Sequence, residues 1–274
     1  MPHIPLEDDF NDVINKAQRG LGISDEDLQQ RAEVSAEDLA AVKAGRPLDA
    51  VLRRVARHLK LSPDALETLA HKRWYPRIPD FPKGFAAFNT PHGSMRVNSY
   101  LVWDPRARIA AAFDTGSDSR GMLDVIAAER LRLRYIFLTH THPDHVADLP
   151  ALASATGAEV WSSELEPADH PGARTFPENA HFHVGSIAVK TLLTCGHSPG
   201  LTTFYLTGLS WPLAFVGDAL FASSMGGSAT RFADQVRNNK EKILTLPRDT
   251  VIAPGHGPLT TLAQEKLHNP FLAR

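Results

Sequence analysis

The chain has 274 residues, of which 43% are hydrophobic, enough to bury the core of one large domain and a small one. Its 29 basic and 31 acidic residues give a net charge of −2, which excludes the basic excess of a general polyanion binder. No apolar run approaches the ~20 residues of a membrane span, and we expect no membrane partner. The first residues lack the basic and apolar segments of a secretory signal. A single cysteine allows no internal disulfide, so we predict a cytoplasmic protein.

The first part of the chain predicts a small all-α domain. Gly, Ser-Asp and Ser-Pro signals separate short amphipathic segments, which we expect to be helices at 12–19, 25–33, 36–43, 48–60 and 63–72. Ser24, Ser35 and Ser62 stand at N-cap positions. The apolar positions predict a core belonging to this domain alone, made of Leu28, Leu39, Val42, Leu52, Val55 and Leu59. We assign 1–73 to this domain and 74–84 to a semi-rigid, proline-containing linker.

Residues 26–44, followed by Gly-Arg-Pro, resemble the helix-turn-helix of Cro-type repressors, and 61–66 resemble the closing helix of that family. Such a motif implies DNA binding. However, the would-be recognition helix begins with acidic Glu37 and Asp38 and lacks the Arg, Asn or Gln that read bases. Residues 1–75 also hold 11 Lys/Arg against 13 Asp/Glu. We therefore favour a packing or homodimerisation module over a nucleic-acid partner.

A metal site is predicted after the apolar run at 134–138, which reads as a buried strand. Four metal ligands follow within six residues: His140, His142, Asp144 and His145. If the extended conformation continues through residue 141, alternation places both imidazoles of the His-x-His pair on one face. The Asp-His pair then falls in the turn that starts the next helix. Imidazole and carboxylate ligands suit zinc, with iron and manganese as near competitors.

Three further ligands repeat this pattern downstream. His197 follows the apolar run 187–193, Asp218 follows 214–217, and His256 follows 251–255. Glycine stands beside each of them and allows the backbone to turn sharply. Because ligands at one edge of a packed sheet lie close together, we expect one site rather than several.

The His-x-His-x-Asp-His box, then Gly-His, Gly-Asp and Pro-Gly-His, resemble the metallo-β-lactamase fold superfamily over about residues 85–274. The resemblance implies an α+β fold, an αββα sandwich, here preceded by the helix-turn-helix-like domain. It implies two divalent metal ions, zinc first and iron or manganese as alternatives. The first metal would be held by His140, His142 and His197, the second by Asp144, His145 and His256, with Asp218 bridging both. Asp114 in the Asp-x-Gly turn would orient ligands from behind.

Segments 217–221, 246–261 and 265–271 resemble the glyoxalase-II-like branch, whose members hydrolyse glutathione thioesters. Glutathione-using relatives carry Gly-Cys-Gly-Lys/Arg after the bridging Asp, whereas this chain has 223–229, with Gly227 in place of the basic residue. We therefore predict a metal-dependent hydrolase of a small acyl ester or thioester, with glutathione thioesters as poor substrates. A metal-bridging hydroxide would attack, and Asp144 and Asp218 would serve as the catalytic carboxylates.

Two other functions remain open. A mononuclear-iron dioxygenase for sulfur compounds (persulfide-type) would use the equivalents of His140, His197 and Asp218. A DNA-binding regulator would use the metal domain only to sense a ligand. The seven-ligand set favours the dinuclear hydrolase, because a sensor does not need two metals with open positions, and no Ser or Cys nucleophile is paired with a base.

Overall fold

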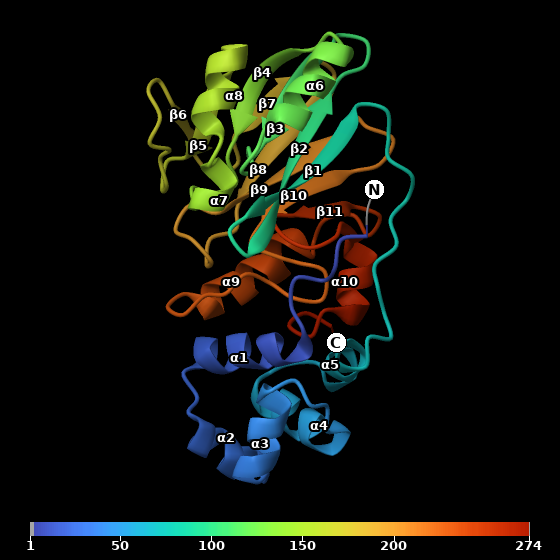
Figure 1. Cartoon of the computed structure of the whole chain (residues 1–274), viewed down its shortest axis with the longest axis vertical. Coiled ribbons are helices and arrows are strands. Elements are labelled where there is room, and N and C mark those ends of the chain that lie inside the picture. Colours follow the sequence, from blue (N-terminus) through green and yellow to red (C-terminus); the bar gives the residue numbers. More distant parts are fainter. Residues whose placement is uncertain (1–2, 274) are drawn as a thin grey trace.

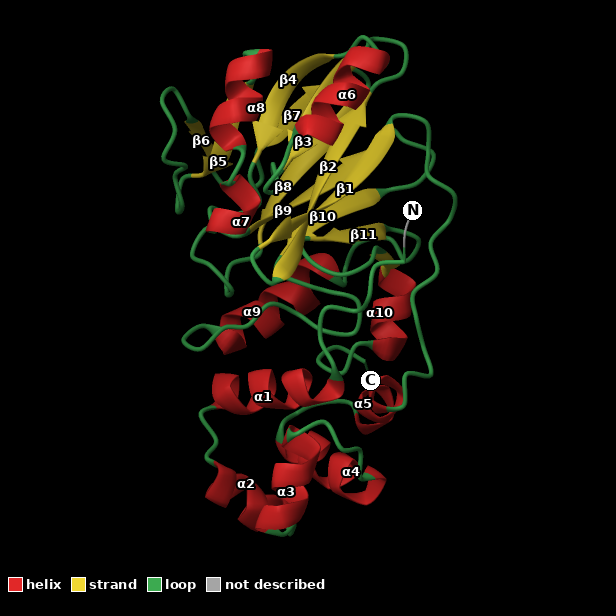
Figure 2. Cartoon of the chain, in the orientation of Figure 1, coloured by secondary structure: helices red, strands yellow, loops and turns green. Residues whose placement is uncertain are grey.

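The computed structural model describes residues 3–273 and contains two six-stranded sheets packed face to face, with helices on both outer sides (Figures 1 and 2). The predicted α+β fold, an αββα sandwich preceded by helices, is confirmed. Within the described residues, every helix is too short or too polar to cross a membrane.

The first sheet has the order β1-β2-β3-β4-β5-β6. Its strands are β1 (Phe85–His92), β2 (Met95–Trp103), β3 (Ile109–Phe113), β4 (Arg132–Phe137), β5 (Glu159–Ser163) and β6 (Arg174–Phe176). Strands β1 to β3 are antiparallel, and β3 to β6 are parallel. Helices α6 (Arg120–Ala128) and α8 (Leu149–Thr156) cover its outer face through an apolar layer that includes Leu101, Ile136 and Leu152.

The second sheet has the order β12-β11-β10-β9-β8-β7. Its strands are β7 (His181–Val184), β8 (Ile187–Leu193), β9 (Thr202–Thr207), β10 (Leu213–Gly217), β11 (Val251–Pro254) and β12 (Thr260–Thr261). All pairs are antiparallel except β10 with β11, so the carboxyl ends of these two strands meet at one edge. Aromatic side chains fill the space between the sheets, where Phe113 stacks on Phe215 with ring centroids 4.0 Å apart.

The amino-terminal region is all-helical, as predicted. Its helices are α1 (Phe10–Leu21), α2 (Asp25–Ala32), α3 (Ala36–Lys43), α4 (Asp49–His58) and α5 (Pro63–Ala70). Ser24, Ser35 and Ser62 cap α2, α3 and α5, because each hydroxyl accepts a hydrogen bond from the amide three residues later. The six apolar residues expected to form the core of this region are all buried.

The expectation that this core belongs to the helical region alone is wrong. The buried residues of α1 to α5 form one hydrophobic cluster with the outer face of the second sheet and with the carboxyl-terminal segment, including Leu220 and Phe271. Three helical elements complete this layer: α9 (Phe232–Asn238), the π-helix η1 (Asn239–Ile243) and α10 (Leu262–His268). Helix α1 contacts α9, and α5 contacts α10 (Figure 1). The helices reach this arrangement because their apolar stripes would otherwise face water.

Residues 74–84 contain neither helix nor strand, but they are fixed to the rest of the chain. Trp74 stacks on His268 with ring centroids 4.6 Å apart, and the Arg77 amide donates to the Gln264 side chain over 2.8 Å. The domain limits at 73 and 84 stay a prediction, since packing continues across this segment.

Candidate metal centre

All seven predicted ligands lie at the carboxyl ends of strands from both sheets. The loop after β4 carries His140 and His142, and helix α7 (Pro143–Val146) carries Asp144 and His145. The second sheet supplies the remaining ligands just after β8, β10 and β11: His197, Asp218 and His256. The structure thus brings together residues separated by more than a hundred positions in the sequence.

One detail of the first loop differs from the prediction. Strand β4 ends at Phe137, so the extended run does not reach residue 141. The chain leaves the sheet because the Thr139 amide donates to the Asp114 carboxylate over 2.7 Å. His140 and His142 still face the same site, with ring centroids 4.6 Å apart.

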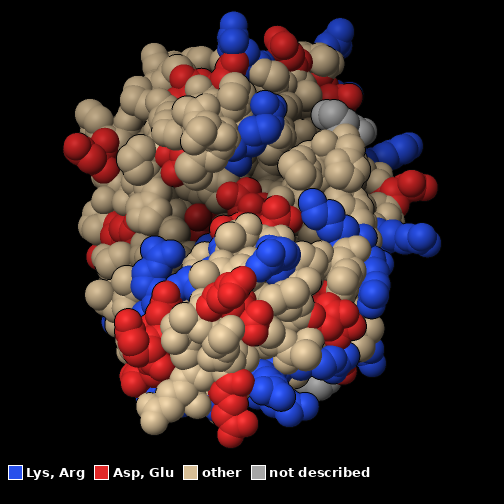
Figure 3. Space-filling view, turned by 60° about the horizontal axis from the view of Figure 1, so that its bottom comes forward, with Lys and Arg blue, Asp and Glu red and all other residues tan. Residues whose placement is uncertain are grey.

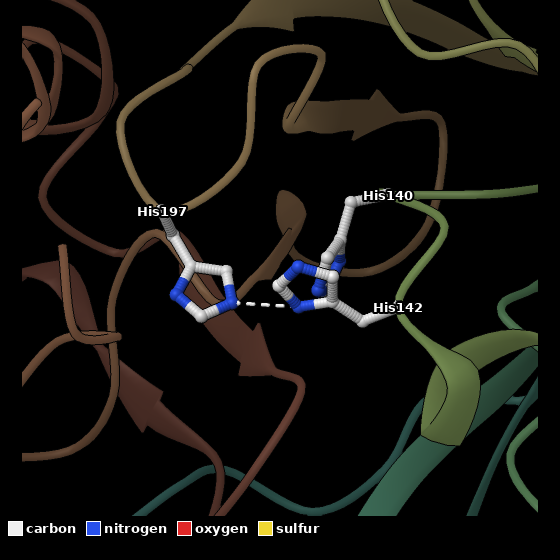
Figure 4. A group of neighbouring side chains, drawn as sticks. All are labelled: His140, His142 and His197. Carbon is white, nitrogen blue, oxygen red and sulfur yellow. Dashed lines mark hydrogen bonds between the residues drawn. The ribbon is translucent and has the colours of Figure 1, made fainter. Parts of the chain in front are cut away.

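The first ligand group consists of three imidazoles. Ring nitrogens of His140, His142 and His197 lie within 4.8 Å of one another. Figure 4 shows the three rings converging from two loops, with His142 Nδ1 and His197 Nε2 only 3.0 Å apart. Convergent nitrogens at this spacing fit a zinc or iron ion.

The second group combines a carboxylate and two imidazoles. Ligand atoms of Asp144, His145 and His256 also lie within 4.8 Å of one another. The Asp144 Oδ2 atom is 3.2 Å from His256 Nε2 and 3.5 Å from His145 Nε2. All three residues are buried, so their charges are shielded little by water.

The Asp218 carboxylate lies between the two groups. Its Oδ2 atom is 3.4 Å from His197 Nε2 in the first group and 3.5 Å from His256 Nε2 in the second. Its Oδ1 atom is 3.3 Å from His145 Nε2. This is the position that a bridging carboxylate would occupy.

Buried polar atoms without partners test whether metal ions suit these residues. His140 Nε2, His145 Nε2 and Asp218 Oδ1 are buried and form no well-aligned hydrogen bond among the described residues, although the last two atoms lie 3.3 Å apart. A buried polar atom without a partner costs free energy. Because all three atoms face the same space, cations between them would remove this cost. The donor set therefore fits divalent metals, while the assignment of each ligand stays a prediction.

The Asp114 carboxylate binds the loop and helix that carry His140 and His145, on the side away from the ligand groups. Asp114 adopts a left-handed conformation with φ of 56°, which is unfavourable for a residue with a side chain. Its Oδ2 atom accepts hydrogen bonds of 2.8 Å from the Thr139 hydroxyl and from His145 Nδ1. With its Nδ1 proton held there, His145 presents Nε2 to the site. Backbone carbonyls of Gly227 and Arg96 hold the Nδ1 atoms of the two downstream imidazoles in the same way.

Glu166 is a further residue of the site that the sequence analysis missed. Its Oε1 atom accepts hydrogen bonds from the Thr141 amide and hydroxyl at 2.8 and 2.9 Å. Its Oε2 atom accepts from the Ser198 hydroxyl at 2.6 Å and the Gly200 amide at 2.8 Å. One carboxylate thus joins the two loops that carry His140, His142 and His197. The signal that could have revealed it is its position just after β5, a parallel neighbour of β4.

The imidazoles and carboxylates of the site shift one another's pKa values. Burial raises the pKa of the Asp218 carboxyl, but His145 and the other imidazoles outweigh burial and hold this pKa well below its ordinary value. Burial lowers the pKa of His256, but the hydrogen bond with Asp144 raises it to about 9. A metal ion replaces such protons on its ligands, so metal binding here would release protons.

The fold and the clustered His and Asp side chains define a metal-binding αββα protein. Residues 92–256 match the family model described as the Metallo-beta-lactamase superfamily. The chain belongs to this superfamily.

Known relatives agree with this assignment. The chain is 31% identical over 212 residues to the probable metallo-hydrolase YqgX of Bacillus subtilis, covering 66% of this chain and 95% of that protein. It is 29% identical over 207 residues to the hydroxyacylglutathione hydrolase GloC of Haemophilus influenzae, again covering 66% and 95%. A solved structure, TTHA1623 in a di-iron-bound form, superposes with a TM-score of 0.55 at 28% identity, covering 68% of this chain and all of that one.

Proposed function

We propose that this protein is a dinuclear metallohydrolase that cleaves an ester-like bond, a thioester or related acyl ester of a small molecule. The position of Asp218 carries this proposal, because its two carboxylate oxygens lie 3.3 to 3.5 Å from imidazoles of both ligand groups. A site for a single metal ion would require only one of the two ligand groups to have all three of its ligands. His140, His142 and His197 would hold one metal, and Asp144, His145 and His256 the other.

When bound, two such cations supply a hydroxide near neutral pH and polarise the carbonyl of the substrate. Asp144 and Asp218 provide two of the negative charges that balance the cations. Asp114 and Glu166 fix the loops so that the ligands need not reorganise during turnover.

Zinc is the proposed metal, because nitrogen and carboxylate ligands suit it. Iron would satisfy the same donors, and the di-iron form of TTHA1623 supports iron as the alternative. The competing function, a mononuclear-iron dioxygenase of sulfur compounds, would leave the group containing His256 without a metal.

The proposed substrate is a thioester or related acyl ester other than a glutathione thioester. GloC is named as a hydroxyacylglutathione hydrolase. In this chain, Gly227 stands where glutathione-using relatives carry a basic residue, and an added Cβ there would meet no atom within 4 Å. Without that cation, glutathione would contribute less binding energy to the transition state.

Metal content measured together with hydrolysis tests the proposal. We expect two metals per chain, and loss of about one metal in each of His140→Ala and His256→Ala, with thioester hydrolysis falling by roughly a thousandfold or more in both. His181→Ala, an exposed imidazole on β7, is the matched control and should keep both metals and full activity. One tightly bound iron in the wild type, unaffected by His256→Ala, would contradict the dinuclear hydrolase and favour the dioxygenase.

A further inference from the structure

A cavity of about 220 Å³ lies beside the metal centre, where helix α1 meets the loop after Asp218. It is lined by Lys16, Arg19, Gly227, Ser228 and Ala229. The carbonyl oxygen of Gly227 accepts a hydrogen bond of 2.8 Å from His197 Nδ1. The wall of the cavity is therefore one hydrogen bond away from a proposed metal ligand.

Two cationic side chains of helix α1 line this cavity, and in the described chain only one of them is paired with a carboxylate. The Lys16 ammonium pairs with the Asp8 carboxylate and donates to the Met225 carbonyl over 3.0 Å, which leaves one of its three donors free. Arg19 is exposed and forms no ion pair within residues 3–273. Because Asp8 balances Lys16, Arg19 gives the cavity a net positive charge.

Backbone amides add uncharged donors to the same wall. The N–H groups of Gly227, Ser228 and Ala229 find no acceptor in the described part of the chain. The Ser228 hydroxyl donates to the Gly196 carbonyl over 2.7 Å, and this fixes the loop beside His197. These amides belong to lining residues and have no acceptor among the described residues, so together with the Arg19 guanidinium they can donate to an anion in the cavity.

We propose that this cavity binds an oxyanion, a carboxylate or a phosphate, carried by the substrate at some distance from the scissile bond. The inference rests on the proposed hydrolase function, whose substrate class it narrows to anionic acyl esters and thioesters. Glutathione thioesters stay the poorer substrates in this proposal, because Arg19 reaches the cavity from α1 and not from loop position 227, where glutathione-using relatives carry their cation. It gives the helical region a role in catalysis, since α1 supplies substrate-binding side chains to a site built otherwise by the sandwich.

The kinetic test compares thioesters that differ in charge. The substrates are the neutral S-acetyl-N-acetylcysteamine, S-acetyl-N-acetylcysteine with a carboxylate on the leaving group, S-succinyl-N-acetylcysteamine with a carboxylate on the acyl group, and S-acetyl phosphopantetheine with a phosphate. For the wild type we expect a kcat/KM at least about tenfold higher on one anionic substrate than on the neutral one, the size of one good ion pair. The identity of the preferred substrate shows whether the cavity binds a carboxylate or a phosphate. It also shows whether that anion belongs to the leaving group or to the acyl group.

Charge reversal then tests the residues themselves. Arg19→Glu should lower kcat/KM for the preferred anion about tenfold more than for the neutral thioester, mainly through KM. Gly227→Glu, which has open space for its side chain, should do the same and serves if the first variant fails to fold. The matched control is Arg57→Glu. Arg57 is an exposed arginine on α4 outside the cavity, and its replacement should leave kcat/KM unchanged for both substrates. Equal losses on anionic and neutral substrates in both cavity variants would overturn the inference.

A binding measurement separates this inference from the proposed function. Calorimetric titration of the metal-loaded full chain with N-acetyl-S-methylcysteine, a thioether that cannot be hydrolysed, should give tighter binding than its neutral carboxamide, and Arg19→Glu should remove the difference. If no thioester is hydrolysed but this preference is found, the hydrolase proposal fails and the anion site stands. If thioesters are hydrolysed without regard to charge and both thioethers bind alike, the anion site fails and the hydrolase stands.

Discussion

Glu166 shows how one side chain can fix two loops of the metal centre. Burial alone would raise the pKa of this carboxyl, but hydrogen bonds from Ser198, Thr141 and Gly200 outweigh burial and lower the pKa. The carboxylate is therefore charged near neutral pH and accepts from both loops at once. Each hydrogen bond to a charged acceptor is stronger than one to a neutral acceptor.

We predict that Glu166→Gln weakens metal binding by roughly ten- to a hundredfold, the usual cost of losing a partner behind metal ligands. The carbonyl oxygen of glutamine can still accept from one loop, but its NH2 group cannot accept, so the other loop loses its anchor. Competition with a chelator measures the affinity, and Glu164→Gln, an exposed carboxylate two residues earlier, is the control. Unchanged metal affinity in Glu166→Gln would mean that the two loops hold their positions without it.

Glu265 on α10 is a second buried carboxyl, and it makes stability depend on pH. Burial raises its pKa from 4.5 to about 7, although hydrogen bonds from Asn269, Thr260 and Ser223 act against burial. The folded protein therefore holds a proton between pH 4.5 and about 7 that the unfolded chain has released. The contribution of Glu265 to the free energy of unfolding therefore falls as pH rises through this window.

Glu265→Gln should remove this loss of stability at high pH. A glutamine amide can donate to the Thr260 hydroxyl, while its oxygen accepts from Ser223 and Asn269. We expect the free energy of unfolding at pH 8 to exceed that of the wild type by up to about 3 kcal/mol, and the difference to vanish near pH 4.5. Urea denaturation across this range is the measurement, with exposed Glu129→Gln as control. A constant difference at all pH values would show that Glu265 does not carry the proton.

At the scale of elements, helix α1 joins the helical region to the sandwich. Gly20 lies against the Phe232 ring of α9, and a Cβ built at Gly20 would come within 2.3 Å of that ring. Lys16 extends from the same helix to the Met225 carbonyl, and its ammonium lies 5.3 Å from the centre of the Phe221 ring. This close approach places α1 beside the proposed anion site.

Gly20→Ala should therefore destabilise the protein, although alanine favours an isolated helix over glycine by about 1 kcal/mol. Overlap with the base of the Phe232 side chain requires α1 and α9 to separate, and overpacking of this kind costs roughly 1–3 kcal/mol. Thermal or urea unfolding measures the change. Gly121→Ala in α6, where the new Cβ would lie 3.3 Å from one ring atom of Phe88, should cost much less. A more stable Gly20→Ala protein would refute the close docking of the two helices.

At the scale of the whole molecule, basic and acidic residues are nearly balanced, with 29 Lys and Arg against 31 Asp and Glu. Figure 3 shows basic and acidic side chains interspersed on the face that it presents, without a continuous basic stripe. Helix α4 carries Arg53, Arg54 and Arg57, the residues best placed to contact DNA. Arg53 is paired with Asp64 at 2.8 Å and Glu67 at 2.6 Å. Arg54 donates to the Glu33 carbonyl over 2.9 Å. The guanidinium groups of Arg53 and Arg54 therefore already bind acceptors within the helical region.

We therefore predict no sequence-dependent DNA binding tighter than about 1 μM, because few phosphates could be neutralised and few counterions released. Anisotropy titrations with random and genomic fragments, at low and moderate salt, are the measurement. A submicromolar, sequence-dependent complex that disappears in the double variant Arg53→Glu/Arg57→Glu would revive the regulator. The predicted role of the helical region in homodimerisation stays a prediction. Sedimentation of the same protein preparations would measure the oligomeric state.

The sequence by itself determined the class of fold and the residues that gather at the site. Each ligand follows an apolar strand, and the three downstream ligands also stand beside glycine, so a local pattern of a few residues identifies them. Serine caps likewise depend only on the residue and the three that follow it. Asp114 was predicted from the resemblance of its Asp-x-Gly turn to the turn of the superfamily.

Only the tertiary structure decided which distant residues support the site. Glu166 joins loops near positions 141 and 199, and Lys16 meets Met225 across 209 positions of sequence. The helical region shares its core with the second sheet, and strand β4 ends early because Asp114 draws the Thr139 amide away. No local pattern encodes such contacts, since each is selected by the free energy of burying and pairing groups that become neighbours only in the folded chain.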